Sequence, residues 1–169
     1  AGGLTVRSEY PAMNTTAHVD TFVRDHLPPV SQWPEFLFEL PELQFPDRIN
    51  CASEVLDRWV TQEQGERPCL VGADGTCWTY AQVQQQANRI ANVLVQDLGI
   101  VPGNRVLLRG ANSPMLAICW FAVVKAGAIA VGSMPLLRAK ELAQIIDRGQ
   151  ISHALCDIRL ADELKLAQS

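Results

Sequence analysis

The stretch 113-SPMLAICWFAVVKAGAIAVGSMP-135 decides the predicted fold, because it reads as a buried helix followed at once by a buried strand. Ser113 can cap the helix with its hydroxyl, and Pro114 suits the first helical position, where its missing N–H would have had no partner. Nearly every residue from Met115 to Val124 is apolar, so we expect neighbouring elements to cover this helix on more than one side. We interpret Lys125, at the end of the helix, as a partner of the helix dipole.

The strand predicted after this helix covers residues 128–131. Gly127 ends the helix because glycine accepts the left-handed conformation that side chains resist, and the residues that follow are small and apolar. Strands and helices alternate around this unit, which is typical of a parallel sheet. We therefore predict an α/β fold, a Rossmann-like parallel sheet flanked by helices, with strands at 105–108, 128–131 and 152–156 and further helices at 138–148 and 158–167.

Two helices and a small β-hairpin precede the sheet. The first helix is predicted over residues 50–64, since apolar residues recur there at helical spacing, namely Val55, Leu56, Trp59 and Val60. Residues 68–72 and 76–79 are predicted to pair as the hairpin. Thr79 and Gln82 match a capping box, which opens a long helix that ends at Gly99. Its apolar stripe is predicted to comprise Tyr80, Val83, Ala87, Ile90, Leu94 and Leu98.

Residues 1–49 are expected to form an irregular N-terminal arm, distinct from the α/β unit at 50–169. Prolines exclude a long helix in much of it, namely Pro28, Pro29, Pro34, Pro41 and Pro46. A short helix is predicted over residues 16–26, where Val19, Phe22 and Val23 share one face. We expect the arm to pack on the domain, or on a partner surface, through its other aromatic side chains, Trp33, Phe36, Phe38 and Phe45.

Composition and charge exclude several classes of function. The net charge is −4, with acidic and basic residues interspersed, so the basic patch that nucleic acid requires is missing and we expect no nucleic-acid partner. The longest apolar run, from Met115 to Val124, is about half of the ~20 residues that a membrane span needs. The sequence does not begin with a positively charged segment followed by an apolar stretch, so we expect no secretory signal. We expect a cytoplasmic protein with no membrane partner.

The five cysteines form no C-x-x-C pair and are interpreted as buried, reduced thiols. A disulfide between Cys69 and Cys77, which flank the hairpin turn, is a minor alternative. None of the three histidines is spaced from cysteines or carboxylates in a way that indicates a metal site, so we predict no metal ligand.

The carboxyl ends of the strands are the expected place for a ligand, because open parallel sheets bind ligands at this edge. Two loops are candidates, Gly110 to Ser113 and Gly132 to Pro135. Neither contains the three glycines of a dinucleotide site, and no lysine follows a glycine-rich phosphate loop. Ser113 is better explained as a cap than as a nucleophile, and Arg138 is either a phosphate ligand or a solvated arginine. The residues alone predict no catalytic set.

From Phe45 onward, the order of features resembles the N-terminal part of the acyl-adenylate-forming superfamily, the acyl- and aryl-CoA ligases. Trp78-Thr79-Tyr80 with Ala87-Asn88 is similar to the first core motif of that superfamily. Val124-Lys125-Ala126-Gly127-Ala128 is similar to the second.

Two longer segments resemble one subclass of that superfamily. The segment 134-MPLLRAKELAQIIDRGQISHALCD-157 is similar to benzoate-type CoA ligases, and 17-AHVDTFVRDHLPPVSQWPEF-36 is similar to the arm of 2-aminobenzoate-CoA ligases. The resemblance implies an enzyme that uses ATP and Mg²⁺ to convert an aromatic acid, benzoate or 2-aminobenzoate, into an aryl-adenylate. The aryl group then passes to coenzyme A, and AMP and pyrophosphate are released.

The same resemblance implies that the phosphate loop, the ribose motif, the catalytic lysine and most of the aryl pocket lie downstream of Ser169. We therefore expect the chain to be a fragment that is inactive alone and holds no catalytic residue. In the family, a basic residue just after the proline that matches Pro135 can meet a phosphate of coenzyme A. Leu136 stands at that position, which leaves Arg138 as a nearby substitute.

Two other interpretations stay open. The chain can be a free-standing Rossmann-like module that binds a nucleotide or another ligand, or a structural or interaction domain without catalysis. A homodimer is compatible with all of these interpretations.

Overall fold

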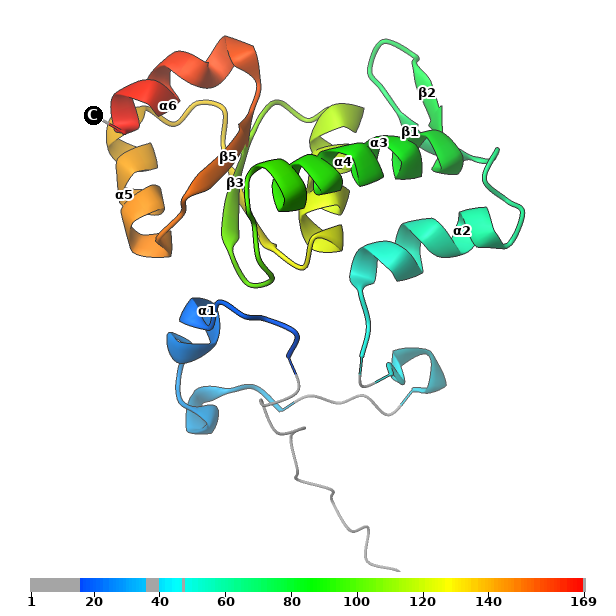
Figure 1. The fold of residues 1–169 in the computed structure, drawn as a ribbon, viewed down its shortest axis with the longest axis horizontal. Coiled ribbons are helices and arrows are strands. Elements are labelled where there is room, and N and C mark those ends of the chain that lie inside the picture. Colours follow the sequence, from blue (N-terminus) through cyan, green and yellow to red (C-terminus); the bar gives the residue numbers. More distant parts are fainter. Residues whose placement is uncertain (1–15, 36–39, 47, 169) are drawn as a thin grey trace, which may run out of the picture.

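The computed structural model describes residues 16–35, 40–46 and 48–168. An N-terminal arm lies against one end of an α/β unit (Figure 1). In the described part of the chain, no helix is long and apolar enough to cross a membrane. The helices are α1 (Phe22–Asp25), α2 (Arg58–Thr61), α3 (Tyr80–Asn92), α4 (Pro114–Lys125), α5 (Ala139–Gly149) and α6 (Ala161–Ala167), and the strands are β1 (Pro68–Val71), β2 (Cys77–Thr79), β3 (Arg105–Arg109), β4 (Ile129–Ser133) and β5 (His153–Cys156).

The centre of the unit is a parallel sheet with the order β4-β3-β5. The central strand β3 is buried along its whole length. At its carboxyl end, Arg109 pairs with Ser133 of β4 on one side and with Cys156 of β5 on the other. The predicted parallel α/β sheet is confirmed, although β4 runs to Ser133 and not only to Val131.

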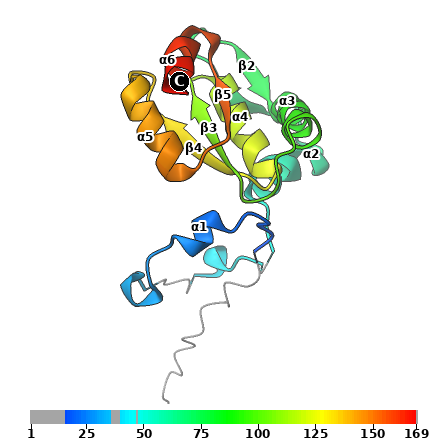
Figure 2. The ribbon, with the colours of Figure 1, turned by 60° about the vertical axis from the view of Figure 1, so that its left-hand side comes forward.

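Helices cover both faces of this sheet (Figure 2). Val106 and Leu108 of β3 point to the face on which α4 packs, and α3 packs in turn against α4. Leu107 points to the opposite face, where it contacts Leu142 of α5 and Leu164 of α6. Because side chains alternate along a strand, Arg105 and Arg109 share the face of Leu107. This placement puts one arginine at each end of β3.

The helix α4 has the predicted boundaries. The Ser113 hydroxyl accepts a hydrogen bond from the backbone N–H of Leu116 at 3.3 Å, and Gly127 has a left-handed φ of 72° just beyond the helix. The expectation that neighbours cover the helix on more than one side is confirmed, because the sheet packs against it on one side and α3 on another, although Met115 and Trp120 are exposed. Both residues border the clefts at the carboxyl edge of the sheet.

The two helices before the sheet both contain a π-helical turn that the sequence did not predict. The capping box of α3 is confirmed, but the helix continues as a π-turn over Val93–Asp97. The N–H of Leu98 bonds to the carbonyl of Val93, five residues back. The wider turn moves Leu98 off the predicted stripe and leaves it exposed, whereas Ile100 is buried. A second π-turn, Ser53–Asp57, precedes α2, and Val55 is likewise exposed.

The hairpin places its cysteines out of register. Val71 stands opposite Cys77, so Cys69 does not face Cys77, and all five cysteines are free. The alternative of a disulfide is therefore wrong. The expectation of buried thiols is also wrong for Cys51 and Cys77, which are exposed, whereas burial raises the pKa of the Cys119 thiol.

The elements after β4 lie close to their predicted positions. The helix α5 is confirmed with bounds shifted by one residue at each end. The last predicted helix is divided, because residues Ile158–Leu160 form a 3₁₀ turn before α6 begins. Asp157 starts this turn, and its side chain accepts a hydrogen bond from the N–H of Arg159.

The arm contains less helix than predicted, since α1 covers only residues 22–25. The reason is a competing acceptor on the domain. The backbone N–H groups of Val19 and Asp20 both donate to the carbonyl of Pro102, at 2.9 and 3.0 Å, and these bonds hold both residues outside the helix. The side chain of Asp20 then accepts a hydrogen bond from the N–H of Phe22, which starts the short helix.

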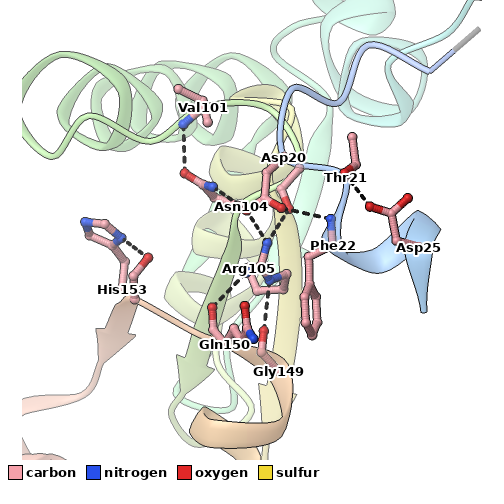
Figure 3. Close-up of polar contacts among 12 residues, drawn as sticks. Asp20, Thr21, Phe22, Asp25, Val101, Asn104, Arg105, Gly149, Gln150 and His153 are labelled. Atoms are coloured by element: carbon pink, nitrogen blue, oxygen red, sulfur yellow. Dashed lines mark hydrogen bonds and ion pairs between the residues drawn. The ribbon is translucent and has the colours of Figure 1, made fainter. Parts of the chain in front are cut away.

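Asp20 and Phe22 also anchor the arm to the sheet (Figure 3). The Asp20 carboxylate pairs with the guanidinium of Arg105 and accepts a hydrogen bond from Asn104 at 2.8 Å. The ring of Phe22 lies 4.6 Å from that guanidinium. Gly103 permits this close approach, because a Cβ there would lie 2.2 Å from the carbonyl oxygen of Asp20.

The sequence favoured four other aromatic side chains as anchors, Trp33, Phe36, Phe38 and Phe45. Phe36 and Phe38 lie outside the described residues. Trp33 donates its ring N–H to the carbonyl of Pro28 within the arm, at 2.7 Å. Phe45 is exposed. The arm thus packs on the domain, as predicted, through Asp20 and Phe22, and the anchoring role of the four aromatic side chains stays a prediction.

Candidate functional site

The carboxyl edge of the sheet carries two clefts, in line with the rule for open parallel sheets. The first has a volume of about 390 Å³ and lies where β3 and β4 end. Both loops that the sequence singled out contribute to it, Asn112 and Ser113 from one and Gly132 and Ser133 from the other. Trp120 of α4 forms part of its wall. The structure thus brings the two candidate loops together at one cleft, and a ligand there stays a prediction.

The second cleft, of about 330 Å³, lies where β3 and β5 end. Its ionisable side chains are Arg109, Cys119, Cys156 and Asp157. Hydrogen bonds from Arg159 hold the pKa of Asp157 at about 2, so that carboxylate is ionised at neutral pH. Burial raises the pKa of both thiols. None of these shifts moves a group toward neutral pH, and the arrangement therefore suits binding and positioning more than proton transfer.

Arg109 is the residue of this edge that the sequence reasoning missed. Its side chain is 1% exposed. One terminal nitrogen donates to the carbonyl of Met134 at 3.1 Å, and the other donates to the carbonyls of Pro135 and Leu137 at 3.2 and 2.9 Å. Its Nε donates to the carbonyl of Leu160 at 3.3 Å. These acceptors lie 25 to 51 residues further along the chain, so no local motif could reveal them.

Arg138 is the one site residue that the sequence reasoning named, and it stands at the start of α5. Its guanidinium donates to a carboxylate oxygen of Glu163 at 2.9 Å. The other oxygen of Glu163 accepts the N–H of Ala139 at 2.8 Å. The hydrogen bond from Arg138 is the main reason why the pKa of Glu163 lies below its usual range. Arg138 as a phosphate ligand stays a prediction.

Lys125 has a different partner from the one predicted. Its Nζ donates to the carboxylate of Asp57 at 2.6 Å and to the side-chain oxygen of Asn88. Gln84 donates to the same oxygen of Asp57 at 3.0 Å. The side chain therefore ties α4 to α3 and to the π-turn at residues 53–57. The interpretation of Lys125 as only a dipole partner is incomplete, because the dominant contact is a partly buried ion pair.

The Ser113 hydroxyl is engaged in the helix cap. Within residues 16–35, 40–46 and 48–168, no three His, Cys, Asp or Glu side chains gather as a metal site would require. The described residues thus offer clefts, hydroxyl and amide groups and an exposed guanidinium at one edge of the sheet. Such an edge can bind and orient a ligand.

Comparison with known proteins identifies a family. Residues 56–169 match the model of the family described as "AMP-binding enzyme". Over 86 residues the chain is 43% identical to the salicyl-AMP ligase / salicyl-S-ArCP synthetase of Mycobacterium tuberculosis. Over 85 residues it is 39% identical to long-chain fatty acid transport protein 1 of Rattus norvegicus. The aligned regions cover 51% and 50% of this chain.

Solved structures agree with this result. A benzoate CoA ligase from Burkholderia xenovorans LB400 superposes with a TM-score of 0.65 over 72% of this chain, at 19% identity, which shows the shared fold. The anthranilate CoA ligase AuaEII, in complex with anthranoyl-AMP, superposes with a TM-score of 0.64 over 69% of the chain, at 26% identity.

The similarity concerns only a part of these larger proteins. The chain spans 14% and 13% of the length of the two sequence relatives, and 24% and 22% of the two solved chains. The family model, however, matches well over half of this chain, and the parallel α/β fold is the one that the benzoate CoA ligase shares. The chain therefore belongs to the AMP-binding enzyme family.

Proposed function

We propose that this chain supplies the N-terminal α/β unit of an AMP-forming aryl-CoA ligase. The match to the AMP-binding enzyme family over residues 56–169 is the observation that carries this proposal. The aromatic substrate class is supported by the anthranilate CoA ligase, whose similarity covers 69% of the chain. The relative named as a long-chain fatty acid transport protein makes aliphatic acids the alternative class.

The chemistry of such a ligase follows from the poor reactivity of a carboxylate. One carboxylate oxygen attacks the α-phosphorus of ATP, pyrophosphate leaves, and an aryl-adenylate forms. The thiolate of coenzyme A then attacks the acyl carbon and expels AMP, because a phosphate oxygen is a far better leaving group than oxide. In this proposal the described residues bind and orient the substrates, since the two clefts form a wall of the larger enzyme.

The cofactors of the proposed reaction are ATP, Mg²⁺ and coenzyme A. The described residues form no carboxylate cluster, so we assign none of them to Mg²⁺. Arg138 fits a phosphate of coenzyme A in charge and exposure, since 77% of its side chain is exposed. A phosphate has to displace the carboxylate of Glu163 from this guanidinium. We therefore propose Arg138 as a ligand that exchanges Glu163 for the phosphate.

We further propose that the enzyme works in the cytoplasm. All five cysteines are free, and two of them, Cys51 and Cys77, are exposed. Exposed free thiols fit a reducing compartment.

The test uses the full-length protein that carries these residues, supplied with ATP, Mg²⁺, coenzyme A and one acid at a time. We expect acid-dependent release of AMP that is faster with benzoate or 2-aminobenzoate than with a long-chain fatty acid. A preference for the fatty acid would contradict the aromatic class, and ADP in place of AMP would contradict the ligase itself. The 169-residue chain alone should release no AMP, and turnover by it would disprove the claim that the reactive groups lie elsewhere.

A further inference from the structure

The strand β3 carries a buried arginine at each end, and the two arginines hold different parts of the protein. Arg105, at the amino end, is 7% exposed, and Arg109, at the carboxyl end, is 1% exposed. Arg105 donates to the carbonyls of Gly149 and Gln150 at the end of α5, at 2.9 and 2.8 Å, and pairs with Asp20 of the arm (Figure 3). Its contacts join elements at the edge remote from the clefts.

Arg109 holds a loop at the edge where the clefts lie. Three of its four hydrogen bonds go to carbonyls of the 134–138 loop, Met134 to Arg138, and the fourth goes to Leu160 before α6. A guanidinium has five donors in a planar fork, which lets one side chain fix several carbonyls at once. Burying this charge is costly unless the donors are satisfied. The loop shape and the burial of Arg109 therefore depend on each other.

Apolar packing holds the same loop through Leu137, which packs against the core cluster of Leu107, Leu142 and Leu164. Leu136 at its tip is 80% exposed, and Met134 is also exposed. Within the loop, the N–H of Leu137 bonds to the carbonyl of Met134 at 3.2 Å, and the N–H of Arg138 bonds to the side chain of Glu141 at 3.1 Å. Three carbonyls of this loop accept hydrogen bonds from Arg109, so the arginine and the packing of Leu137 together hold the loop.

We propose that Arg109 is a positioning residue for the thiol substrate, because it sets the shape in which the 134–138 loop presents Leu136 and Arg138. This inference rests on the proposed function, in which a phosphate-bearing thiol, coenzyme A, is the second substrate. Arg109 touches no reacting atom. It acts through the loop, which places the Arg138 guanidinium where a phosphate can replace Glu163.

The experiment measures the second half-reaction of the full-length enzyme with two thiols. Coenzyme A carries phosphates, and pantetheine offers the same thiol arm without them. In Arg109→Lys the positive charge stays, but a single ammonium cannot span carbonyls from the loop and from Leu160. We expect kcat/KM for coenzyme A to fall about tenfold, the effect of losing hydrogen bonds that fix a binding loop. We expect a smaller change for pantetheine, so that the preference for the phosphorylated thiol shrinks.

Arg105→Lys is the matched control. It makes the same substitution in the same strand, at a similarly buried site that also bonds backbone carbonyls. It should lower thermal stability as Arg109→Lys does, but it should keep the wild-type preference for coenzyme A over pantetheine. Equal preference ratios in the two variants would overturn the positioning role and leave the ligase assignment standing.

Two further outcomes are decisive. If the wild-type enzyme forms no thioester with either thiol, the proposed function fails, and the inference fails with it. If Arg109→Lys does not fold, amide hydrogen exchange on the wild-type enzyme replaces it. Saturating coenzyme A should then slow exchange in the 134–138 loop and leave the residues around Gly149 unchanged. No slowing in the loop would overturn the inference.

Discussion

Replacing Lys125 distinguishes the ion pair seen in the structure from the helix-dipole interpretation. Lys125→Met keeps most of the apolar stem and removes the ammonium group. In the wild type that group contacts Asp57 at 2.6 Å and also Asn88, and the side chains of Lys125 and Asp57 are 11% and 24% exposed. After the substitution, the Asp57 carboxylate retains the hydrogen bond from Gln84 but loses its counter-charge.

The two interpretations predict different free energies. A cation at an exposed helix end contributes about 0.3–1 kcal/mol through the dipole. Removing one partner of a buried ion pair costs about 3–5 kcal/mol, because the other charge is left uncompensated. Asp57 is partly exposed, so water replaces some of the lost interaction. We therefore expect Lys125→Met to lower the free energy of unfolding by about 2–3 kcal/mol.

Urea unfolding of four proteins measures this cost: the wild type, Lys125→Met, Asp57→Asn and the double variant. The ion pair predicts a coupling energy of at least about 1 kcal/mol between the two sites. Arg58→Met is the control, because its pair with Glu54 spans 3.9 Å between half-exposed side chains and should change stability by less than about 0.5 kcal/mol. A cost below about 1 kcal/mol with no coupling would refute the ion pair and restore the dipole interpretation.

Three other predictions concern the arm, a turn and the thiols. A backbone N–H donor and a neighbouring guanidinium lower the pKa of Asp20 below 3.8, so its contribution to docking the arm is present above that pH and is lost as the pH falls through the folded value. The protection factors of the amides at residues 18–22, in which the intrinsic pH dependence of exchange is divided out, should fall under those acidic conditions, and Asp20→Asn should abolish this fall. Gly103→Ala should lower the free energy of unfolding by about 2 kcal/mol or more, because the new Cβ meets a backbone oxygen at a positive φ. Gly99→Ala is the control, since open space surrounds Gly99, and it should cost about 1 kcal/mol. Equal costs in the two variants would contradict the close contact at Gly103. An alkylating reagent should modify Cys77 before Cys119, as followed by peptide mass spectrometry, because Cys77 is exposed and burial raises the pKa of Cys119. Modification of both thiols at the same rate would contradict the burial of Cys119.

Local signals in the sequence predicted the elements that have local causes. The Ser113 cap and the Thr79–Gln82 capping box need only a side chain and a backbone N–H within three residues of each other. The alternation of apolar runs was sufficient to predict the parallel sheet. The rule about carboxyl ends indicated two candidate loops, and the structure brings both to one cleft.

Contacts between distant segments explain what the sequence did not predict. The helix predicted around Val19 does not form, because the N–H groups of Val19 and Asp20 bond to the carbonyl of Pro102, more than eighty residues away in the chain. The partner of Arg138 is Glu163 of another helix. Arg109 reads as part of an ordinary strand end, and only the fold brings four carbonyls around it. Spacing along a sequence carries no signal for such contacts.

The most direct test of the central claim follows one oxygen atom. The full-length protein is supplied with ATP, Mg²⁺, coenzyme A and benzoate or 2-aminobenzoate in which both carboxylate oxygens are the heavy isotope. Since the carboxylate attacks phosphorus and the bond from carbon to that oxygen breaks later, one heavy oxygen should appear in the phosphate of AMP for each thioester formed. AMP without the heavy isotope, or heavy oxygen in inorganic phosphate with ADP as the nucleotide product, would contradict the assignment of this chain to an AMP-forming aryl-CoA ligase.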